Sequence, residues 1–210
     1  MKLFLSLCCC IAILLSGCDD AYYNDGGLLD NRIGVYEGTT MSYLESQPAL
    51  FDTLTTLIKL NNMEEEVNRK GSTFFAPQNY SIYNYLLLKY PDPENRPKTL
   101  EAIPAGDMAE MAGYISDYII PNEQIVRSDL STVYSYSTTL SDKKARFNLV
   151  REDYLGNVNM GAAYIIYSVN LNPPATPEFY SPAKVVVTDV ATTTGTVHVL
   201  ISDTHIFGFN

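Results

Sequence analysis

The chain has no tryptophan, two histidines and four cysteines among its 210 residues, and each shortage disfavours a kind of site. His198 and His205 are the only imidazoles, so no cluster with the ligand spacing of a zinc site is recognisable. The sequence contains no G-x-S-x-G elbow to activate a serine and no glycine-rich phosphate loop. We therefore expect no catalytic residue, no cofactor and no metal, and a protein that is not an enzyme.

Basic residues are scarce as well, with 14 Lys and Arg against 24 Asp and Glu and a formal net charge of −10. A protein that binds the phosphate backbone needs a basic face, so nucleic acid is not an expected partner. Hydrophobic residues make up 46% of the chain and charged residues 18%, which favours a packed core over disorder. The length predicts one domain with additional segments.

Three of the four cysteines, at positions 8–10, lie in an apolar run that follows Lys2. A basic start, a short apolar run and small residues are typical of a secretory signal, and the run is shorter than the ~20 apolar residues of a membrane span. Residues 15–18, Leu-Ser-Gly-Cys, resemble the bacterial lipobox. We expect a signal peptide over residues 1–17 and lipid attachment at Cys18; the alternative is an ordinary signal peptide with an incidental cysteine.

Cleavage there leaves Cys18 as the sole cysteine, so the mature chain has no intramolecular disulfide. Two or more acyl chains anchor a protein durably to a membrane. Residues 18–38 lack sustained periodicity and contain several Gly, Asn and Asp, which predicts a flexible tether with a reach of roughly 25 Å. The expected location is the envelope, at the outer membrane of a Gram-negative bacterium, with exposure at the cell surface left open.

Residues 39–210 are predicted to form the domain, with helices before strands. Apolar side chains recur at helical spacing in three stretches, whose predicted start signals are Ser42, Asn79 and Asp107. β-Branched and aromatic runs predict strands at residues 73–76, 132–140, 145–151, 162–169, 185–190 and 196–201. The run 185–190 has apolar residues of both parities, which predicts a strand covered on both faces. Segregated helices and strands indicate an α+β fold.

Three motifs, in order, resemble the boxes of the fasciclin (FAS1) family. Residues 73–82 are similar to T-x-F-A-P-T-D-x-A-F, with asparagine in place of a helix-capping aspartate. Residues 115–121 resemble a box with a Tyr-His pair, although the histidine is absent, and residues 189–200 are similar to D-x-x-x-x-N-G-x-V-H-V-I. The matched positions are Thr73, Phe75, Ala76, Pro77, Asn79, Tyr118, Asp189, Gly195, Val197, His198 and Val199.

The resemblance extends over residues 41–201 and implies an α+β domain in which a β-wedge, or sandwich, of two sheets packs against several helices. It also implies that His198 is a fold-defining residue, and that the domain acts in adhesion or protein–protein interaction without catalysis. Together with Cys18, it predicts a lipid-anchored lipoprotein that is held to a membrane by its N-terminal lipid. Its expected partner is an extracellular or envelope protein.

Tyrosine is abundant, with 16 residues, and several lie in the strand-rich half: Tyr134, Tyr136, Tyr154, Tyr164, Tyr167 and Tyr180. Exposed aromatic rings stack on sugars or dock proteins, whereas most tyrosines pack at the core or rim with a wet hydroxyl. The packing interpretation is favoured, and the absence of tryptophan weakens a sugar platform. The alternative function is an accessory glycan-binding surface lipoprotein of an uptake complex, working beside an outer-membrane transporter.

Overall fold

The computed structural model describes residues 34–158 and 160–209. The predicted signal peptide and Cys18 lie outside the described residues. The helices are α2 (Thr40–Glu45), α3 (Pro48–Leu60), α4 (Glu64–Val67), α5 (Asn79–Lys89) and α6 (Ala105–Asp117), with 3-10 turns η2 (Leu100–Ala102), η3 (Arg127–Asp129) and η4 (Phe207–Phe209). The strands are β1 (Ser72–Ala76), β2 (Ile119–Ile120), β3 (Ser135–Thr138), β4 (Lys144–Arg151), β5 (Ala163–Asn170), β6 (Tyr180–Ala191) and β7 (Gly195–Leu200).

The strands form one mixed sheet in the order β2-β1-β7-β6-β5-β4-β3. Strands β1 and β7 are parallel, and all other neighbours are antiparallel. The long strand β6 pairs with β5 through its first half and with β7 through its second, so it joins two halves of the sheet. The N–H of Leu140, in the β3–β4 turn, donates to the Ile119 carbonyl in β2 at 2.9 Å and brings the two ends of the sheet together. The predicted α+β fold class is confirmed.

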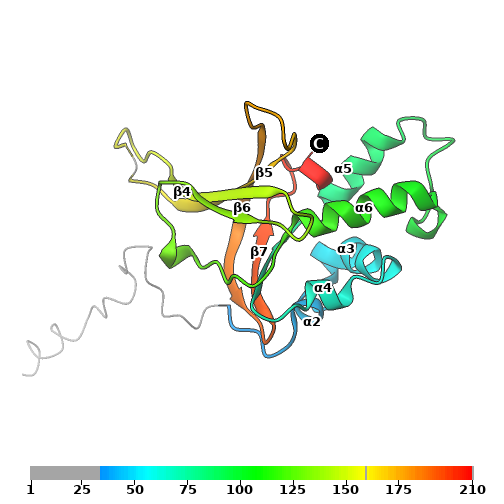
Figure 1. Ribbon diagram of the computed structural model, residues 1–210, viewed down its shortest axis with the longest axis horizontal. Helices are drawn as coiled ribbons and strands as arrows, with labels where there is room; N and C mark the ends of the chain where they lie inside the picture. The colour runs from blue at the N-terminus through cyan, green and yellow to red at the C-terminus, as the bar shows by residue number, and fades with distance from the viewer. Residues whose placement is uncertain (1–33, 159, 210) are drawn as a thin grey trace, which may run out of the picture. The chain divides into compact units, whose positions relative to one another are not determined.

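The helices gather on one side of the sheet (Figure 1). Helix α3 begins at Pro48, where the missing N–H has no intrahelical partner in any case. Its buried face is built from Phe51, Leu54 and Ile58, and these side chains belong to the same core cluster as the central strands. Helices therefore cover the sheet with the apolar stripe that the sequence predicts.

The three predicted helix starts are wrong in detail. Ser42 is not the cap of its helix; instead its N–H donates to the side chain of Thr39, which caps α2. The first of the three stretches forms two helices, since α2 ends at Glu45 and α3 begins at Pro48. Helix α5 starts at Asn79 itself, and α6 starts at Ala105, so Asp107 lies in the first turn, after the cap position.

The strand predictions need two corrections. Val186 and Val187 are 47% and 42% exposed, so β6 is not covered on both faces. Apolar residues of both parities occur because the pairing of β6 with β7 contains register shifts. Each extra residue turns the following side chains to the other face, so Val185 and Val190 are both buried although their spacing is odd. The predicted helix through Ile119 ends instead at Asp117, and residues 119–120 form the short strand β2.

Candidate functional site

The three sequence motifs meet around the neighbouring interior strands β1 and β7. Within the parallel pair β1–β7, Phe75 lies opposite His198 and Ala76 lies opposite Val199. Tyr118 directly precedes β2, and its carbonyl accepts the N–H of Phe75 at 2.9 Å. The motif residues of β1 and β7 are all buried: Thr73, Phe75, Ala76, Val197, His198 and Val199.

Two polar side chains of these strands hold the segment at residues 123–125. The Thr73 hydroxyl donates to the Glu123 carbonyl at 2.7 Å and accepts the Ile125 N–H at 2.8 Å. His198 donates from Nε2 to the Ile125 carbonyl at 2.9 Å, and its Nδ1 accepts the Asp189 N–H at 3.2 Å. Burial lowers the pKa of His198, which favours this neutral tautomer. With both ring nitrogens engaged by backbone groups, His198 acts as a structural residue.

The backbone conformation limits which residue types fit at Asp189 and at Gly195. Asp189 has a left-handed φ of 60°, and its carboxylate accepts the Arg127 N–H at 2.9 Å. A Cβ on Gly195 would lie 2.1 Å from the Ser72 carbonyl oxygen, because β1 and β7 approach closely at this point. Asp189 therefore serves the irregularity within β6, between Val187 and Val190, and Gly195 serves the close contact of β7 with β1.

Pro77 and Asn79 connect β1 to the helices. Pro77 is buried and follows the end of β1. The Asn79 side chain accepts the Thr53 N–H at 2.9 Å and donates to the carbonyls of Pro48 and Ala49 at 3.2 and 3.3 Å. Asn79 therefore ties the start of α5 to the first turns of α3, which corrects the prediction that it caps its own helix.

A cleft of about 270 Å³ lies beside Asn79, between the first turns of α3 and α5. Its lining includes Leu50, Tyr80 and Tyr83, and the two tyrosine rings stack with centroids 6.1 Å apart. Tyr80 and Tyr83 are 54% and 52% exposed. Of the matched motif positions, Asn79 lines this cleft.

The histidine that contacts Tyr118 comes from the C-terminal segment. The family position for it is occupied by Ile119, and His205 lies beside the tyrosine instead. The Tyr118 hydroxyl accepts the Gly208 N–H at 2.8 Å and shares a hydrogen bond of 2.9 Å with His205 Nε2, in which the tautomer of the histidine sets the donor. Burial raises the pKa of Tyr118 and lowers the pKa of His205 to about 4, so both are neutral at pH 7.

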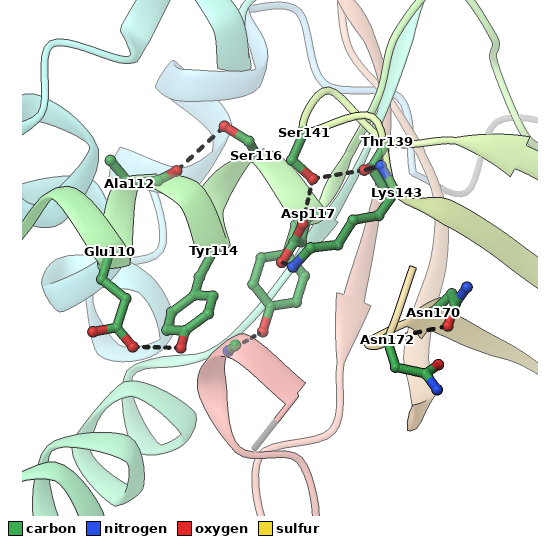
Figure 2. Close-up of polar contacts among 12 residues, drawn as sticks. Glu110, Ala112, Tyr114, Ser116, Asp117, Thr139, Ser141, Lys143, Asn170 and Asn172 are labelled. Carbon is green, nitrogen blue, oxygen red and sulfur yellow. Dashed lines mark hydrogen bonds and ion pairs between the residues drawn. The ribbon is translucent and has the colours of Figure 1, made fainter. Parts of the chain in front are cut away.

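A buried carboxylate, Asp117, lies at the end of α6 (Figure 2). It accepts hydrogen bonds from the Ser141 hydroxyl and from the Lys143 ammonium, the latter at 2.7 Å. The Thr139 and Ser141 hydroxyls lie 2.8 Å apart, and the Tyr167 hydroxyl donates to the Asp117 carbonyl at 2.5 Å. The serine and the lysine are both bound to one carboxylate, so the group anchors the β3–β4 turn to α6. Sequence reasoning missed it because 24 residues separate Asp117 from Ser141.

The tyrosines of the strand-rich half separate into two sets. Tyr167 is buried and stacks on Phe75 with centroids 3.9 Å apart, as the packing interpretation predicts. Tyr134 and Tyr136 are 44% and 53% exposed on the opposite face, where Tyr136 lies across from Arg146 of β4. Tyr154 is exposed in the turn between β4 and β5.

Each tyrosine on this outer face has a cation against its ring. The pairs are Lys144 with Tyr136 at 4.8 Å, Arg146 with Tyr134 at 4.2 Å and with Tyr180 at 4.1 Å, and Lys184 with Tyr164 at 3.8 Å. These distances from cation to ring centroid are within the range of cation–π attraction. We name these seven residues, four tyrosines and three cations, the tyrosine–cation face.

The three cations of this face differ in whether a carboxylate lies beside them. Lys144 lies 3.0 Å from Glu178, and Lys184 lies 3.0 Å from Glu152. Hydrogen bonding to these carboxylates raises the pKa of each lysine, and the hydrogen bond from Lys144 lowers the pKa of Glu178. Arg146 makes no ion pair with any residue in the part of the chain that the structure describes.

The described residues form neither a metal-binding cluster nor a membrane-spanning helix. No cluster of three or more His, Cys, Asp or Glu among residues 34–158 and 160–209 has the geometry to hold a metal ion. No helix within these same ranges is long and apolar enough to cross a bilayer.

Comparison with known proteins identifies the family. A search of the curated proteins gives no match. The solved structure of a FAS1 domain pair from the insect cell adhesion molecule fasciclin I is similar at 16% identity and a TM-score of 0.42; the match covers 81% of this chain and 46% of that chain, so this chain spans less than half of the domain pair. The family model for the fasciclin domain matches residues 49–202, which include all three motifs, and the chain therefore belongs to the fasciclin domain family.

Proposed function

We propose that this protein is a lipid-anchored adhesion protein that binds another protein of the envelope or the extracellular space through its tyrosine–cation face. The observation that carries the proposal is the contrast in exposure between the motifs and this face. The motif residues of β1 and β7 are buried, so they offer no surface to a partner. Tyrosine and arginine are the residues that protein interfaces use most strongly. Here Tyr134 and Tyr136 are exposed, and the half-buried Arg146 of β4 lies beside them.

The anchor in this proposal is a lipid on Cys18, in a chain that is held at the outer membrane of a Gram-negative cell. Its support is the apolar run after Lys2 and the Leu-Ser-Gly-Cys sequence that ends at Cys18. The sequence of residues 18–38 predicts a tether that would give the domain reach beyond the headgroups. Its last part belongs to the domain, because Gly34 and Tyr36 hydrogen-bond to Ala191 of β6. The protein has no catalytic role in this proposal, since His198 and His205 are both buried and hydrogen-bonded.

The contact surface is tested with cells that display the full chain. We expect the double variant Tyr134→Ala/Tyr136→Ala to abolish cell aggregation and crosslinking to the partner. The matched control is Tyr80→Ala/Tyr83→Ala, which removes two rings of similar exposure from α5. Equal losses in the two double variants, or no loss in the first, would overturn the assignment of this surface.

The anchor is tested separately. Cys18→Ser should abolish labelling by a fatty-acid probe and release the protein from the membrane fraction. Labelling that persists in this variant would show that the lipid is attached elsewhere.

A second candidate function is glycan binding as an accessory surface lipoprotein beside an outer-membrane transporter. It is supported by the tyrosine rings on the outer face, since aromatic faces stack on sugars. Against it, each ring already has a cation within 4.8 Å of its centroid, which competes with a sugar for the ring face. Saturable binding of the full chain to a defined polysaccharide, lost in Tyr134→Ala/Tyr136→Ala, would favour this candidate over adhesion.

A further inference from the structure

We propose that Arg146 is the carboxylate receptor of the tyrosine–cation face, and that the carboxylate belongs to an acidic, extended segment of the partner protein. This inference rests on the proposed function and specifies the chemistry of the partner. It is built on the position of the guanidinium, its lack of a counter-ion and the sheet edge beside it.

The guanidinium is held between two aromatic rings. Its central carbon lies 4.2 Å from the ring centroid of Tyr134 and 4.1 Å from that of Tyr180. A planar cation between two rings has lost much of its rotamer freedom before a ligand arrives. Part of the entropy cost of binding is therefore met in the free protein.

The charge of Arg146 lacks a bound counter-ion in the part of the chain that the structure describes. Lys144 and Lys184 each have a carboxylate at 3.0 Å, whereas no described side chain hydrogen-bonds to Arg146, and its Nε is buried without a partner. The charge of Arg146 contributes to the lowered pKa of Glu178, but the carboxylate oxygens of Glu178 are hydrogen-bonded to Lys144 and Tyr180. The outer Nη groups are the remaining donors, and a carboxylate matches them with two parallel hydrogen bonds.

The neighbouring sheet edge favours a protein as the source of this carboxylate. Strand β3 is last in the sheet order, and no described strand forms a ladder with its outer edge; the one link to β2 is the Leu140–Ile119 hydrogen bond beyond the end of β3. An exposed strand edge offers backbone N–H and C=O groups that an extended peptide can pair with. A polysaccharide has no peptide backbone to make this ladder, and the ring faces it needs are next to cations.

The test uses the detergent-solubilised full chain and a fluorescein-labelled decapeptide in which Glu alternates with Thr. Its counterpart carries Gln at every Glu position. By fluorescence anisotropy, we expect the Glu peptide to bind, and the Gln peptide to bind at least roughly tenfold more weakly, as loss of a charge-assisted pair predicts. Arg146→Gln should weaken binding of the Glu peptide by a similar factor, and Arg146→Lys by a smaller one, because lysine lacks the planar fork.

The matched control is Arg151→Gln. Arg151 is exposed on the same strand, and its odd spacing from Arg146 places it on the other face, so the variant removes the same charge without touching the site. We expect its affinity for the Glu peptide to change by less than about twofold. Urea midpoints that match the wild type show that each variant is folded.

Several outcomes overturn the inference. The first is failure of the wild-type chain to bind the Glu peptide, and the second is an equal loss in Arg146→Gln and Arg151→Gln. A third is tighter, Arg146-dependent binding of a galacturonate oligomer, which would make the partner a glycan. Cell aggregation that survives Arg146→Gln but not Tyr134→Ala/Tyr136→Ala overturns this inference alone, whereas aggregation that survives both overturns the proposed function.

Discussion

Strands β1 and β7, two neighbouring interior strands that form the buried centre of the domain, bury every side chain, whereas β3, at the far end of the sheet, alternates half-buried and exposed residues. The central strands carry two of the three family motifs. The Phe75 ring of β1 is packed between two others, with its centroid 5.0 Å from that of His198 in β7 and 3.9 Å from that of Tyr167 in β5. The outer strands carry tyrosines and cations that no motif includes.

The difference shows where a family motif is informative and where it is not. A residue that is enclosed on both sides can change little without a cavity or a clash, so the motif records the fold. Residues on the outer face contact solvent on one side and tolerate exchange, so members of one fold can carry different surfaces there. The comparison therefore predicts large stability effects at β1 and β7, and small stability effects with large effects on binding at the outer face.

The largest expected effect is at Gly195. Gly195→Ala places a Cβ 2.1 Å from the Ser72 carbonyl oxygen, and a backbone atom cannot move aside as a side chain can. We expect a loss of roughly 4 kcal/mol or more in the free energy of unfolding, measured by urea denaturation.

The control for this substitution is Gly113→Ala in α6, where the added Cβ meets nothing within 4 Å. Alanine is the better helix former, so this variant should gain about 0.5–1 kcal/mol. If Gly195→Ala folds with wild-type stability, β1 and β7 do not approach as closely as described.

The next effect is at Phe75. Phe75→Ala removes a fully buried ring and should cost about 3–5 kcal/mol. Phe179→Ala removes the same ring from an exposed position next to β6 and should change stability by less than about 0.5 kcal/mol. Similar urea midpoints for the two variants would contradict the contrast between the centre and the outer face.

The sequence predicted the centre of the sheet better than its surroundings. Residues 73–76 and 196–201 are runs of β-branched and aromatic residues, and their strand character is local. Their parallel pairing is not local, since Phe75 and His198 lie more than a hundred residues apart. The family motifs located both strands but did not supply the partners of Asn79 or the contact between Tyr118 and His205.

The candidate surface was only partly predictable. The spacing of Tyr134 and Tyr136 in a strand predicts that both share one face. In the structure their rings lie 6.4 Å apart and both are exposed, although β3 begins only at Ser135. The position of Arg146 between Tyr134 and Tyr180 depends on the register of β3, β4, β5 and β6 together. Cross-strand register is set by turns, bulges and packing, and no short stretch of sequence contains that information.

The third expected effect is a pH dependence of stability. It arises at the buried His205 and is not expected at the tyrosine–cation face. The pKa of His205 is about 4 in the folded chain, against about 6.5 when unfolded, because burial favours the neutral ring. As the pH falls, His205 therefore takes up a proton in the unfolded chain before it does so in the folded chain. The stability that comes from keeping His205 neutral is complete above pH 6.5 and is lost as the pH falls towards 4. We expect about 3 kcal/mol of stability to disappear over that window.

Urea midpoints between pH 7.5 and 4 measure this loss, and His205→Gln should make the dependence shallower. Its amide can still hydrogen-bond to the Tyr118 hydroxyl but does not titrate. Peptide binding at the tyrosine–cation face should stay constant from pH 7.5 to 6, because the raised pKa values of Lys144 and Lys184 keep both charged. A pH dependence of stability that is unchanged in His205→Gln would show that other groups cause it.

The smallest expected effect is the coupling between Tyr134 and Arg146. At an exposed site a cation–π pair adds about 0.5–1 kcal/mol, so a double-mutant cycle of Tyr134→Ala and Arg146→Gln should give a coupling of that size in urea. The same two variants should each impair partner binding severely. A coupling above about 2 kcal/mol would mean that the pair is built to stabilise the sheet. In that case the outer face would resemble the centre, and the division between a structural core and a binding face would fail.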